Sequence, residues 1–371
     1  MSEEEKKYSH PLYTHCEEKD ADALAWAFID KEKMIKFPFK FPQIGPKEIR
    51  ANVLYTGLCH SDIFKVTGGW GDVIYPIAPG HEIIAEVSQV GTDVKDFKKG
   101  EIVGFGTIRE VCNECKYCKN GNEEVCPFVK ERGTYSKEHW GGYATQIQQP
   151  AEFFYKIPKN FDISKGAPLL CAGITTYYPM FKYLKPGMKT AVIGIGGLGH
   201  VAVQFLSKLN YEVTAFTSSK EKEELIKKLG AKEIILSSDE EQMKNAQNKF
   251  DFVLNTLPIN NKINDYLKTC AICGTFVQVG QPSINNENLT LSANEIVEKE
   301  LTIRGSNVGP RNVTKLMIKL CVDKKIYPMV EEFSFEDFPK AYDRLLNGKP
   351  QFRCVVNVKD FAEKNGWKKN N

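Results

Sequence analysis

Cys59, His81 and Cys171 are the residue types that a catalytic zinc ion takes as ligands. Two thiolates and one imidazole leave a fourth coordination position for water or a substrate. Taken alone, Cys171 is the kind of small residue that fills a gap in an apolar core, so its case depends on the other two. Together the three residues predict a metal centre with one open position.

The residues after Cys59 supply polar groups that such a centre needs. Ser61 lies close enough to Cys59 along the chain to reach the fourth position and to pass a proton from a bound hydroxyl group. Asp62 is placed to orient the His81 ring and so to fix which nitrogen meets the metal. The alternative is a plain strand-to-helix turn with Ser61 or Asp62 as the N-cap. The Gly80-His81-Glu82 stretch downstream favours the metal site.

Four further cysteines predict a second metal site of a different kind. Their spacing is C-x2-C-x2-C-x7-C, at Cys112, Cys115, Cys118 and Cys126. Four thiolates complete a tetrahedron around zinc and leave no open position, which is typical of a structural site. The surrounding lobe, residues 109–128, has little apolar surface, so metal binding would supply much of its folding energy. An iron–sulfur cluster also takes four cysteines, but this spacing is not that of a ferredoxin.

A dinucleotide-binding unit begins near residue 190. It consists of a buried strand, a glycine-rich turn, an apolar helix and a second strand, at Thr190–Ile193, Gly194–Gly199, Val201–Leu209 and Glu212–Phe216. The turn has the form G-x-G-x-x-G, which is a strong signal between a strand and a helix. Gly194 permits the turn, Gly196 lets a pyrophosphate approach the backbone, and Gly199 lets the helix pack on the strand. Gly197 and Leu198 complete the turn before the helix N-terminus.

The end of the second strand selects between cofactors. An NAD site places Asp or Glu there for the ribose hydroxyls, but this chain has Thr217, Ser218 and Ser219. Hydroxyls together with Lys222 suit the 2′-phosphate of NADP, which an acid would repel. Glu221 lies too far along the chain to be that acid. Ser218 or Ser219 also suits an N-cap for the next helix, and both roles are compatible. The sequence predicts NADP in preference to NAD.

Length and periodicity predict two domains, because 371 residues exceed a single core. Strands with intervening turns dominate before residue 171 and return after 310, whereas strands and helices alternate between 172 and 309. We therefore expect a catalytic zinc domain at 1–171, a doubly wound parallel sheet at 172–309 and a return to the catalytic domain at 310–371, with the active site in the cleft between domains. Residues 1–23 are predicted to form a loose arm, and Cys270 and Cys273 to be core residues.

Charge and hydropathy exclude several classes of partner. The chain has 50 basic and 47 acidic residues, a net charge of +3, so we expect neither nucleic acid nor a membrane surface as a partner. The first residues have no apolar signal core, and no apolar run reaches transmembrane length. We therefore expect a cytoplasmic protein whose eleven cysteines serve as thiols and metal ligands rather than disulfides.

The chain resembles the zinc-dependent medium-chain alcohol dehydrogenases, and within them the cinnamyl alcohol dehydrogenase branch, from about Leu24 to Val358. The resemblance rests on the four-cysteine lobe and on five short segments, at Gly57–Asp62, Pro79–Glu82, Leu170–Tyr177, Gly194–Gly199 and Thr217–Ser219. It implies a GroES-like, β-rich catalytic domain and a Rossmann cofactor domain. It also implies a homodimer joined through the cofactor domains.

The resemblance further assigns roles to the candidate residues. It implies a catalytic zinc on Cys59, His81 and Cys171, with Glu82 nearby either as an alternate ligand or as a residue that contacts the ligands. It implies a structural zinc in the lobe, hence two zinc ions per chain, and NADP-dependent reduction of aldehydes to primary alcohols. Ser61 is then the proton donor.

Two positions depart from the pattern that the resemblance implies. Members of the family often have a histidine five residues after the first cysteine, where this chain has Phe64, so protons from Ser61 must leave by another route. The lignin-forming enzymes commonly have Phe where this chain has Asn307, which argues against a strictly aromatic pocket. Trp70 and Trp140 are further candidates for shaping the substrate pocket.

Two other functions fit part of the same pattern. An NAD-linked polyol dehydrogenase also uses zinc, and the cofactor preference would separate it from an NADP-dependent enzyme. A non-catalytic dinucleotide-binding zinc protein, such as a redox sensor, would bind NADPH without turnover. That function does not need a metal with an open coordination position, so the sequence favours an enzyme.

Overall fold

The chain folds around two large sheets, one mainly antiparallel and the other entirely parallel. The computed structural model describes residues 8–128, 139–258, 262–286, 288–348 and 350–367. The chain divides into two units, and each is built around its own sheet. The mainly antiparallel unit comprises residues 1–171, 310–322 and 327–371, and the parallel-sheet unit comprises 172–309 with 323–326.

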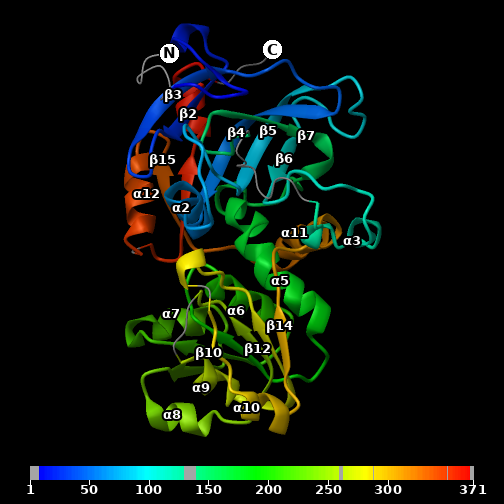
Figure 1. Cartoon of the computed structure of the whole chain (residues 1–371), viewed down its shortest axis with the longest axis vertical. Helices are drawn as coiled ribbons and strands as arrows, with labels where there is room; N and C mark the ends of the chain where they lie inside the picture. The colour runs from blue at the N-terminus through cyan, green and yellow to red at the C-terminus, as the bar shows by residue number, and fades with distance from the viewer. Residues whose placement is uncertain (1–7, 129–138, 259–261, 287, 349, 368–371) are drawn as a thin grey trace. The chain divides into compact units, whose positions relative to one another are not determined.

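The mainly antiparallel unit is built on a seven-stranded sheet with the order β15-β16-β4-β5-β6-β8, in which β7 also pairs with β4. All neighbours are antiparallel except β15 and β16. Its strands are β4 (Glu48–Leu58), β5 (Ile83–Val90), β6 (Ile102–Phe105), β7 (Gln146–Pro150), β8 (Phe154–Lys156), β15 (Val330–Ser334) and β16 (Arg353–Asn357). β4 is the central strand, because it pairs with β5, β7 and β16. It ends at Leu58, directly before Cys59, the first candidate metal ligand. Figure 1 shows β4, β5 and β6 running side by side.

A second, three-stranded sheet has the order β1-β3-β2 and belongs to the same unit. Its strands are β1 (Thr14–His15), β2 (Ala23–Phe28) and β3 (Met34–Lys40). The expectation of a loose arm over residues 1–23 is wrong from Tyr13 onward. Tyr13 is buried and packs against Phe39 and Trp140, at ring-centroid distances of 5.1 and 4.7 Å. These aromatic contacts hold the segment around Tyr13 in place, although its sequence is mostly polar. Residues 1–7 lie outside the described part of the chain.

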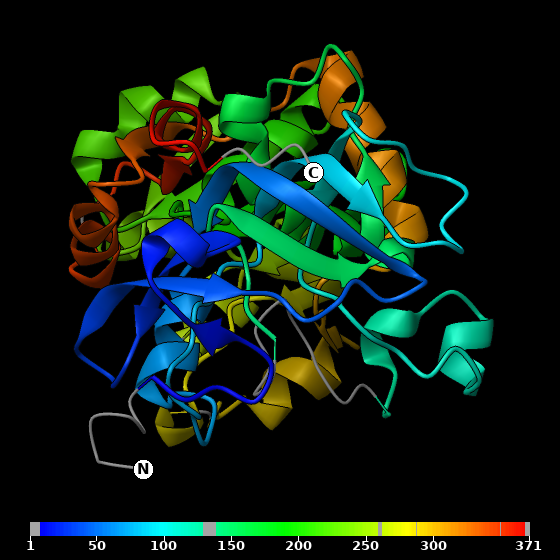
Figure 2. The ribbon, with the colours of Figure 1, turned by 90° about the horizontal axis from the view of Figure 1, so that it is seen from above.

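Short helices connect these strands. They are α2 (His60–Thr67), α3 (Lys116–Lys119), α4 (Ile163–Gly166), α11 (Arg311–Lys324), α12 (Phe338–Leu346) and α13 (Lys359–Lys364), with 3-10 helices η1 (Glu18–Asp20), η2 (Glu123–Val125), η3 (Ala151–Phe153) and η4 (Ala167–Leu170). The lobe that carries α3 and η2 is drawn in teal at the edge of the unit in Figure 2. Because few residues of this lobe are buried, its fold depends on something other than an apolar core.

The parallel-sheet unit has the doubly wound architecture that the sequence predicts. Its six strands have the order β11-β10-β9-β12-β13-β14, and every pair is parallel. The strands are β9 (Thr190–Ile193), β10 (Val213–Thr217), β11 (Glu233–Leu236), β12 (Phe250–Asn255), β13 (Cys270–Gln278) and β14 (Thr302–Gly305). The order reverses beside β9, and such a reversal is where dinucleotides bind in folds of this kind.

Helices alternate with these strands, as Figure 1 shows for α6, α7, α9 and α10. They are α5 (Ala172–Tyr183), α6 (Gly199–Lys208), α7 (Glu223–Lys228), α8 (Glu240–Asn245), α9 (Ile263–Leu267) and α10 (Ala293–Glu298), with 3-10 helices η5 (Lys220–Lys222) and η6 (Ile284–Asn286). All four residues of β9 are buried, as expected for a central parallel strand. The fold class predicted from the sequence is confirmed for both units.

One core prediction is wrong. Cys270 is fully buried at the start of β13, but Cys273 is exposed. Cys273 lies inside β13 with a φ of +59°, where the pairing of β13 with β12 shifts register. The two cysteines of this C-x-x-C therefore have opposite surroundings. In the described part of the chain, no helix has the length and apolar character that crossing a membrane requires.

Candidate active site

Cys59, His81, Glu82 and Cys171 come together in the mainly antiparallel unit. Each offers one ligand atom, and these four atoms all lie within 4.8 Å of one another. All four residues are buried. The structure therefore brings together the three residues predicted as catalytic ligands and the residue predicted as the alternate ligand, although they are separated by up to 112 positions in the chain.

The local fold explains how each ligand is placed. Cys59 stands between the end of β4 and the start of α2, where it is the N-cap. His81 and Glu82 immediately precede β5, which pairs with β4. Cys171 follows η4, whose residues pack against β4, β5, β6 and β16. Cys59 and His81 thus lie at the ends of two paired strands, and Cys171 lies at the end of a packed 3-10 helix. The sheet therefore sets the distances between the ligand atoms.

The donor set fits a zinc ion. Zinc in proteins takes thiolate, imidazole and carboxylate ligands, and this group offers all three types. Among the described residues, Glu82 Oε2 is a buried oxygen without a hydrogen-bond partner. A buried carboxylate oxygen of this kind is costly unless a cation or donor satisfies it. A metal ion bound by the group would supply that cation.

Asp62 holds His81, as the sequence predicts. Its Oδ1 lies 2.9 Å from His81 Nδ1, and both side chains are buried. Because an ionised carboxylate can only accept, Nδ1 carries the proton and Nε2 is the nitrogen available for a metal. The expectation of Ser61 or Asp62 as the N-cap is wrong, because Cys59 holds that position; Asp62 is the third residue of α2 and accepts from the Cys59 N–H at 3.0 Å, as in a capping box. Ser61 is half-buried, and its hydroxyl lies 3.6 Å from Cys59 Sγ.

Arg353 is a residue of the site that the sequence analysis missed. It lies at the start of β16, is 5% exposed, and its guanidinium forms an ion pair with Glu82. The two residues are 271 positions apart. No spacing or motif signals this contact, because only the pairing of β16 with β4 brings Arg353 to the ligand group.

The pKa values of the ligand-type side chains are shifted in opposite directions. The hydrogen bond with Cys171 lowers the pKa of the Cys59 thiol well below its usual range, and the positive charges of Arg353 and His81 add to the effect. Burial lowers the pKa of His81, but Asp62 and Cys59 outweigh it, so that this pKa is raised well above its ordinary value. Burial raises the pKa of Glu82 to about 7 against the opposing charge of Arg353. The lowered pKa of Cys59 favours the thiolate, which is the form of cysteine that binds a metal.

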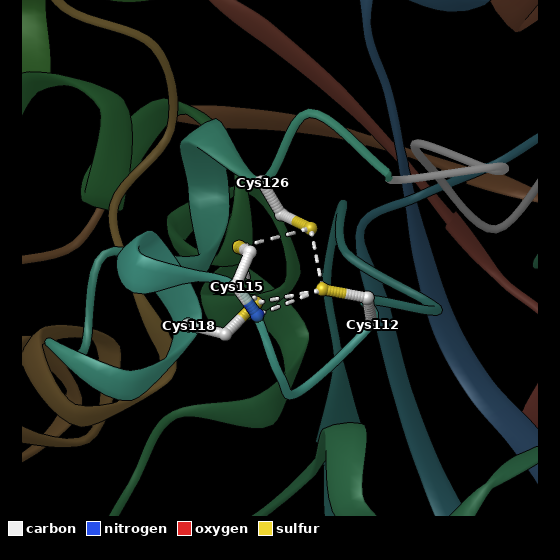
Figure 3. A group of neighbouring side chains, drawn as sticks. All are labelled: Cys112, Cys115, Cys118 and Cys126. Atoms are coloured by element: carbon white, nitrogen blue, oxygen red, sulfur yellow. Dashed lines mark hydrogen bonds between the residues drawn. The ribbon is translucent and has the colours of Figure 1, made fainter.

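The four cysteines of the lobe form the second group of potential metal ligands. The sulfur atoms of Cys112, Cys115, Cys118 and Cys126 face one another in Figure 3. Neighbouring sulfurs are separated by 3.5 to 3.9 Å. A tetrahedral zinc with Zn–S bonds of about 2.3 Å requires about 3.8 Å between sulfurs. The spacing fits a single ion and is too small to enclose a cluster of several irons.

Glu123 connects this lobe to helix α11. Glu123 Oε1 accepts from the backbone N–H of Arg311 at 2.8 Å and from its Nε at 3.0 Å. The same guanidinium donates to Glu152 Oε2 at 2.8 Å and lies over the Phe153 ring, 4.5 Å from its centroid. A carboxylate from the lobe therefore accepts from the first N–H of α11, one of the helix N-terminal donors that have no acceptor within the helix.

The glycine-rich turn lies in the parallel-sheet unit between β9 and α6. Gly194 has a φ of +81°, the left-handed region that favours glycine. A Cβ at Gly199 would lie 2.0 Å from the Gly194 carbonyl oxygen, whereas one at Gly196 would meet nothing within 4 Å. The space beside Gly196 and the tight contact at Gly199 suit the two roles expected of them. Gly197 and Leu198 complete the turn, and α6 begins at Gly199.

The residues expected to select the cofactor lie at the end of β10 and directly after it, and Ser219 among them forms a hydrogen bond that the sequence does not predict. Thr217 is the last residue of β10, and Ser219 stands at the N-cap position of η5 without capping it through its side chain. Instead the Ser219 hydroxyl donates to Glu221 Oε2 at 2.6 Å, and this bond lowers the pKa of Glu221. Ser218 and Lys222 are exposed. A carboxylate thus stands closer to the predicted phosphate site than its sequence position indicates.

The remaining positions that the sequence analysis connects with the proton route or the substrate pocket are Phe64, Trp70, Trp140 and Asn307. Phe64 on α2 packs against Trp70 and His60, at ring-centroid distances of 5.5 and 5.0 Å, in place of the histidine that the family often has. Trp140 is 3% exposed and its Nε1 donates to the Pro76 carbonyl, so it is a core residue rather than a pocket residue. Asn307 is half-buried in the parallel-sheet unit.

Comparisons with known proteins agree with this geometry. Residues 45–159 match the alcohol dehydrogenase GroES-like domain family, and residues 197–323 match the zinc-binding dehydrogenase family. The chain belongs to the zinc-binding medium-chain alcohol dehydrogenases, whose activity is oxidoreduction between alcohols and carbonyl compounds. Within that family it is like the cinnamyl alcohol dehydrogenases.

Three relatives illustrate the similarity. A mannitol dehydrogenase of Petroselinum crispum is 36% identical over 86% of this chain and 97% of its own length. A cinnamyl alcohol dehydrogenase structure from Sorghum bicolor has a TM-score of 0.85 at 30% identity and covers 91% of this chain and 97% of that chain. The CAD structure from Helicobacter pylori, complexed with NADP(H), has a TM-score of 0.83 at 32% identity, with coverage of 91% and 98%.

Proposed function

We propose that this chain is an NADP(H)-dependent zinc enzyme that interconverts aldehydes and primary alcohols. The observation that carries the proposal is the group of four buried ligand-type side chains whose ligand atoms lie within 4.8 Å of one another. Cys59, His81 and Cys171 would hold the ion, and Glu82 is the alternate ligand. A zinc ion there supplies Lewis acidity toward a carbonyl oxygen, while a nicotinamide held by the glycine-rich turn supplies or accepts hydride.

The chain's own residues provide orientation and proton transfer. Asp62 fixes the His81 tautomer, and Arg353 holds the carboxylate of Glu82 by an ion pair. Ser61 presents its hydroxyl 3.6 Å from Cys59 Sγ, next to the ligand group but only half-buried, so it can exchange a proton with a substrate oxygen. Since Phe64 cannot carry a proton, that proton would reach solvent through water or the cofactor ribose.

Two features support NADP(H) as the cofactor. The strand end at Thr217 is followed by Ser218 and Ser219 and not by an acid. The Helicobacter pylori relative is complexed with NADP(H). The contact between Ser219 and Glu221 favours a second candidate, an NAD-linked polyol dehydrogenase, because a carboxylate at this place disfavours a 2′-phosphate. The similarity to a mannitol dehydrogenase supports the same alternative.

The four-cysteine lobe would hold a second, structural zinc, giving two zinc ions per chain. We also propose a homodimer joined through the parallel-sheet units. The edge strand β14 ends in the exposed residues Arg304 and Gly305, and the exposed apolar side chains Ile272 and Val297 belong to the same unit. Exposed strand edges and apolar side chains are features that pairing with a second copy would cover. Light scattering on the purified protein tests this assembly.

The test of the function compares kcat/KM for aliphatic, benzylic and cinnamyl aldehydes with NADPH and with NADH, alongside mannitol with NAD. We expect NADPH-linked aldehyde reduction to be fastest, and Ser61→Ala to slow turnover while zinc content stays unchanged. Faster polyol oxidation with NAD would replace the proposal with the second candidate. Cofactor binding without turnover across the panel would exclude both.

A further inference from the structure

Within the described part of the chain, four donors form hydrogen bonds with Asp62, and three of them belong to residues near it in sequence or next to the ligands. Its Oδ1 accepts from His81 Nδ1 at 2.9 Å and from the Gly80 N–H at 3.2 Å. Its Oδ2 accepts from the Cys59 N–H at 3.0 Å and from the Tyr143 hydroxyl at 2.7 Å. An ionised carboxylate offers about four acceptor sites. Asp62 is fully buried, so these four donors satisfy it without water.

We propose that Tyr143 is a positioning residue for the metal centre, acting through Asp62. This inference rests on the proposed function, because it assumes that Cys59 and His81 hold a metal. One carboxylate fixes both the His81 ring and the backbone of Cys59, so its rotation would move two ligands together. The Tyr143 hydroxyl makes the shortest of the four hydrogen bonds and shares Oδ2 with Cys59. It therefore restrains the rotation of the carboxylate from the side opposite to His81 and Gly80, which donate to Oδ1.

The Tyr143 backbone is held against the segment that leads to His81. Its N–H donates to the Pro79 carbonyl at 2.9 Å, and the preceding N–H of Gly142 donates to the Gly80 carbonyl at 2.8 Å. Gly80 has a φ of +107°, and a Cβ there would lie 2.7 Å from the Tyr143 ring. The two segments can approach this closely only because residue 80 is glycine.

The Tyr143 ring is equally constrained. It is fully buried and meets Phe338, the first residue of α12, edge to face at a centroid distance of 4.6 Å. Phe338 is itself stacked on Trp26. A buried aromatic side chain with two rotatable bonds and fixed neighbours holds its hydroxyl in one place. The helix α12 thereby supports Tyr143, which in turn supports Asp62.

The chain offers a matched control in Tyr342. This tyrosine is also buried and lies on α12, but its hydroxyl has no hydrogen-bond partner within the described residues. Tyr342→Phe and Tyr143→Phe each remove one buried oxygen and leave the ring in place. Only Tyr143→Phe removes a donor from Asp62.

The test measures the metal centre itself. Each variant is loaded with Co²⁺, its visible spectrum is recorded, and the rate of metal loss to a chelator is followed. We expect Tyr143→Phe to shift the cobalt bands and to speed loss of one metal ion by about 10- to 100-fold, with kcat falling more than KM changes. Tyr342→Phe should match the wild type. An unchanged spectrum and loss rate in Tyr143→Phe would overturn the inference.

Two further variants keep the test decisive. In an Asp62→Asn background, Tyr143→Phe should add little, because its effect passes through that carboxylate; full additivity would overturn the inference. If Tyr143→Phe does not fold, Phe338→Leu, which removes no donor, should give the same spectral shift in weaker form, and an unshifted spectrum counts against the inference. A wild-type protein that binds no cobalt outside the lobe would instead refute the proposed function.

Discussion

Replacing Cys118 by alanine should empty the four-cysteine lobe and release the N-terminus of α11. Three thiolates hold zinc less tightly than four, and the lobe has little apolar surface to keep its shape without metal. Glu123, which lies between Cys118 and Cys126, would then lose its fixed position. The consequence should appear at Arg311, which donates to Glu123 through both its backbone N–H and its side chain.

The size of the effect follows from those two contacts. Hydrogen bonds to charged groups contribute about 1.5–3 kcal/mol each, so the pair stabilises the first turn of α11 by about 3–6 kcal/mol at most. Because every 1.4 kcal/mol corresponds to a tenfold change, hydrogen exchange at the Arg311 amide should become faster by at most about 100- to 10,000-fold. The remaining contact with Glu152, whose side chain is half exposed, would retain part of the protection.

Zinc analysis and hydrogen-exchange mass spectrometry check this prediction together. Cys118→Ala should lose one of two zinc ions per chain, with faster exchange in the lobe and at the start of α11. Cys273→Ala, which replaces an exposed cysteine outside both metal groups, is the matched control and should change neither quantity. Loss of zinc with unaltered exchange at Arg311 would refute the idea that the lobe anchors α11. Retention of both zinc ions would refute the lobe as a metal site.

Three further changes test other parts of the molecule. Glu221→Lys removes the carboxylate from Ser219 and should raise the ratio of kcat/KM for NADPH over NADH; an unchanged ratio would place Glu221 outside the cofactor site. Gly194→Ala puts a side chain where φ is +81°, costing about 1–2 kcal/mol, and should weaken dinucleotide binding in calorimetry without loss of zinc. The contact with Arg344 lowers the pKa of Glu331, so its stabilising effect is present above the ordinary glutamate pKa and is lost as the pH falls below it. The difference in Tm between wild type and Glu331→Gln should therefore shrink in acid, and a constant difference would contradict the ion pair.

Local patterns were sufficient to predict the parallel-sheet unit. The strand, glycine-rich turn and helix around Gly194 are set by neighbours in the sequence, so periodicity and glycine spacing locate them. The ligand group was also predictable, because Cys59, His81 and Cys171 are residue types with specific chemistry. Their meeting point depends on the sheet, and the structure places them together.

Contacts between distant segments could not be predicted in the same way. Arg353 and Tyr143 are ordinary arginine and tyrosine residues in sequence, and only the pairing of β16 with β4 and the close approach at Gly80 bring them to the site. Cys273 was mispredicted because it lies at an irregularity of β13, where its φ is positive and the register with β12 shifts, and it is exposed there. The sequence predicts Glu221 to lie too far from the strand end, but the turn of η5 brings its carboxylate back to Ser219.

The central claim is that one metal ion is shared by Cys59, His81 and Cys171 in the mainly antiparallel unit. An anomalous difference map from crystals of the purified protein, with data collected at the zinc absorption edge, measures this directly. Two peaks per chain are predicted, one among those three side chains and one among the four sulfurs of the lobe. A peak in the lobe with none beside His81 would contradict the proposed catalytic centre.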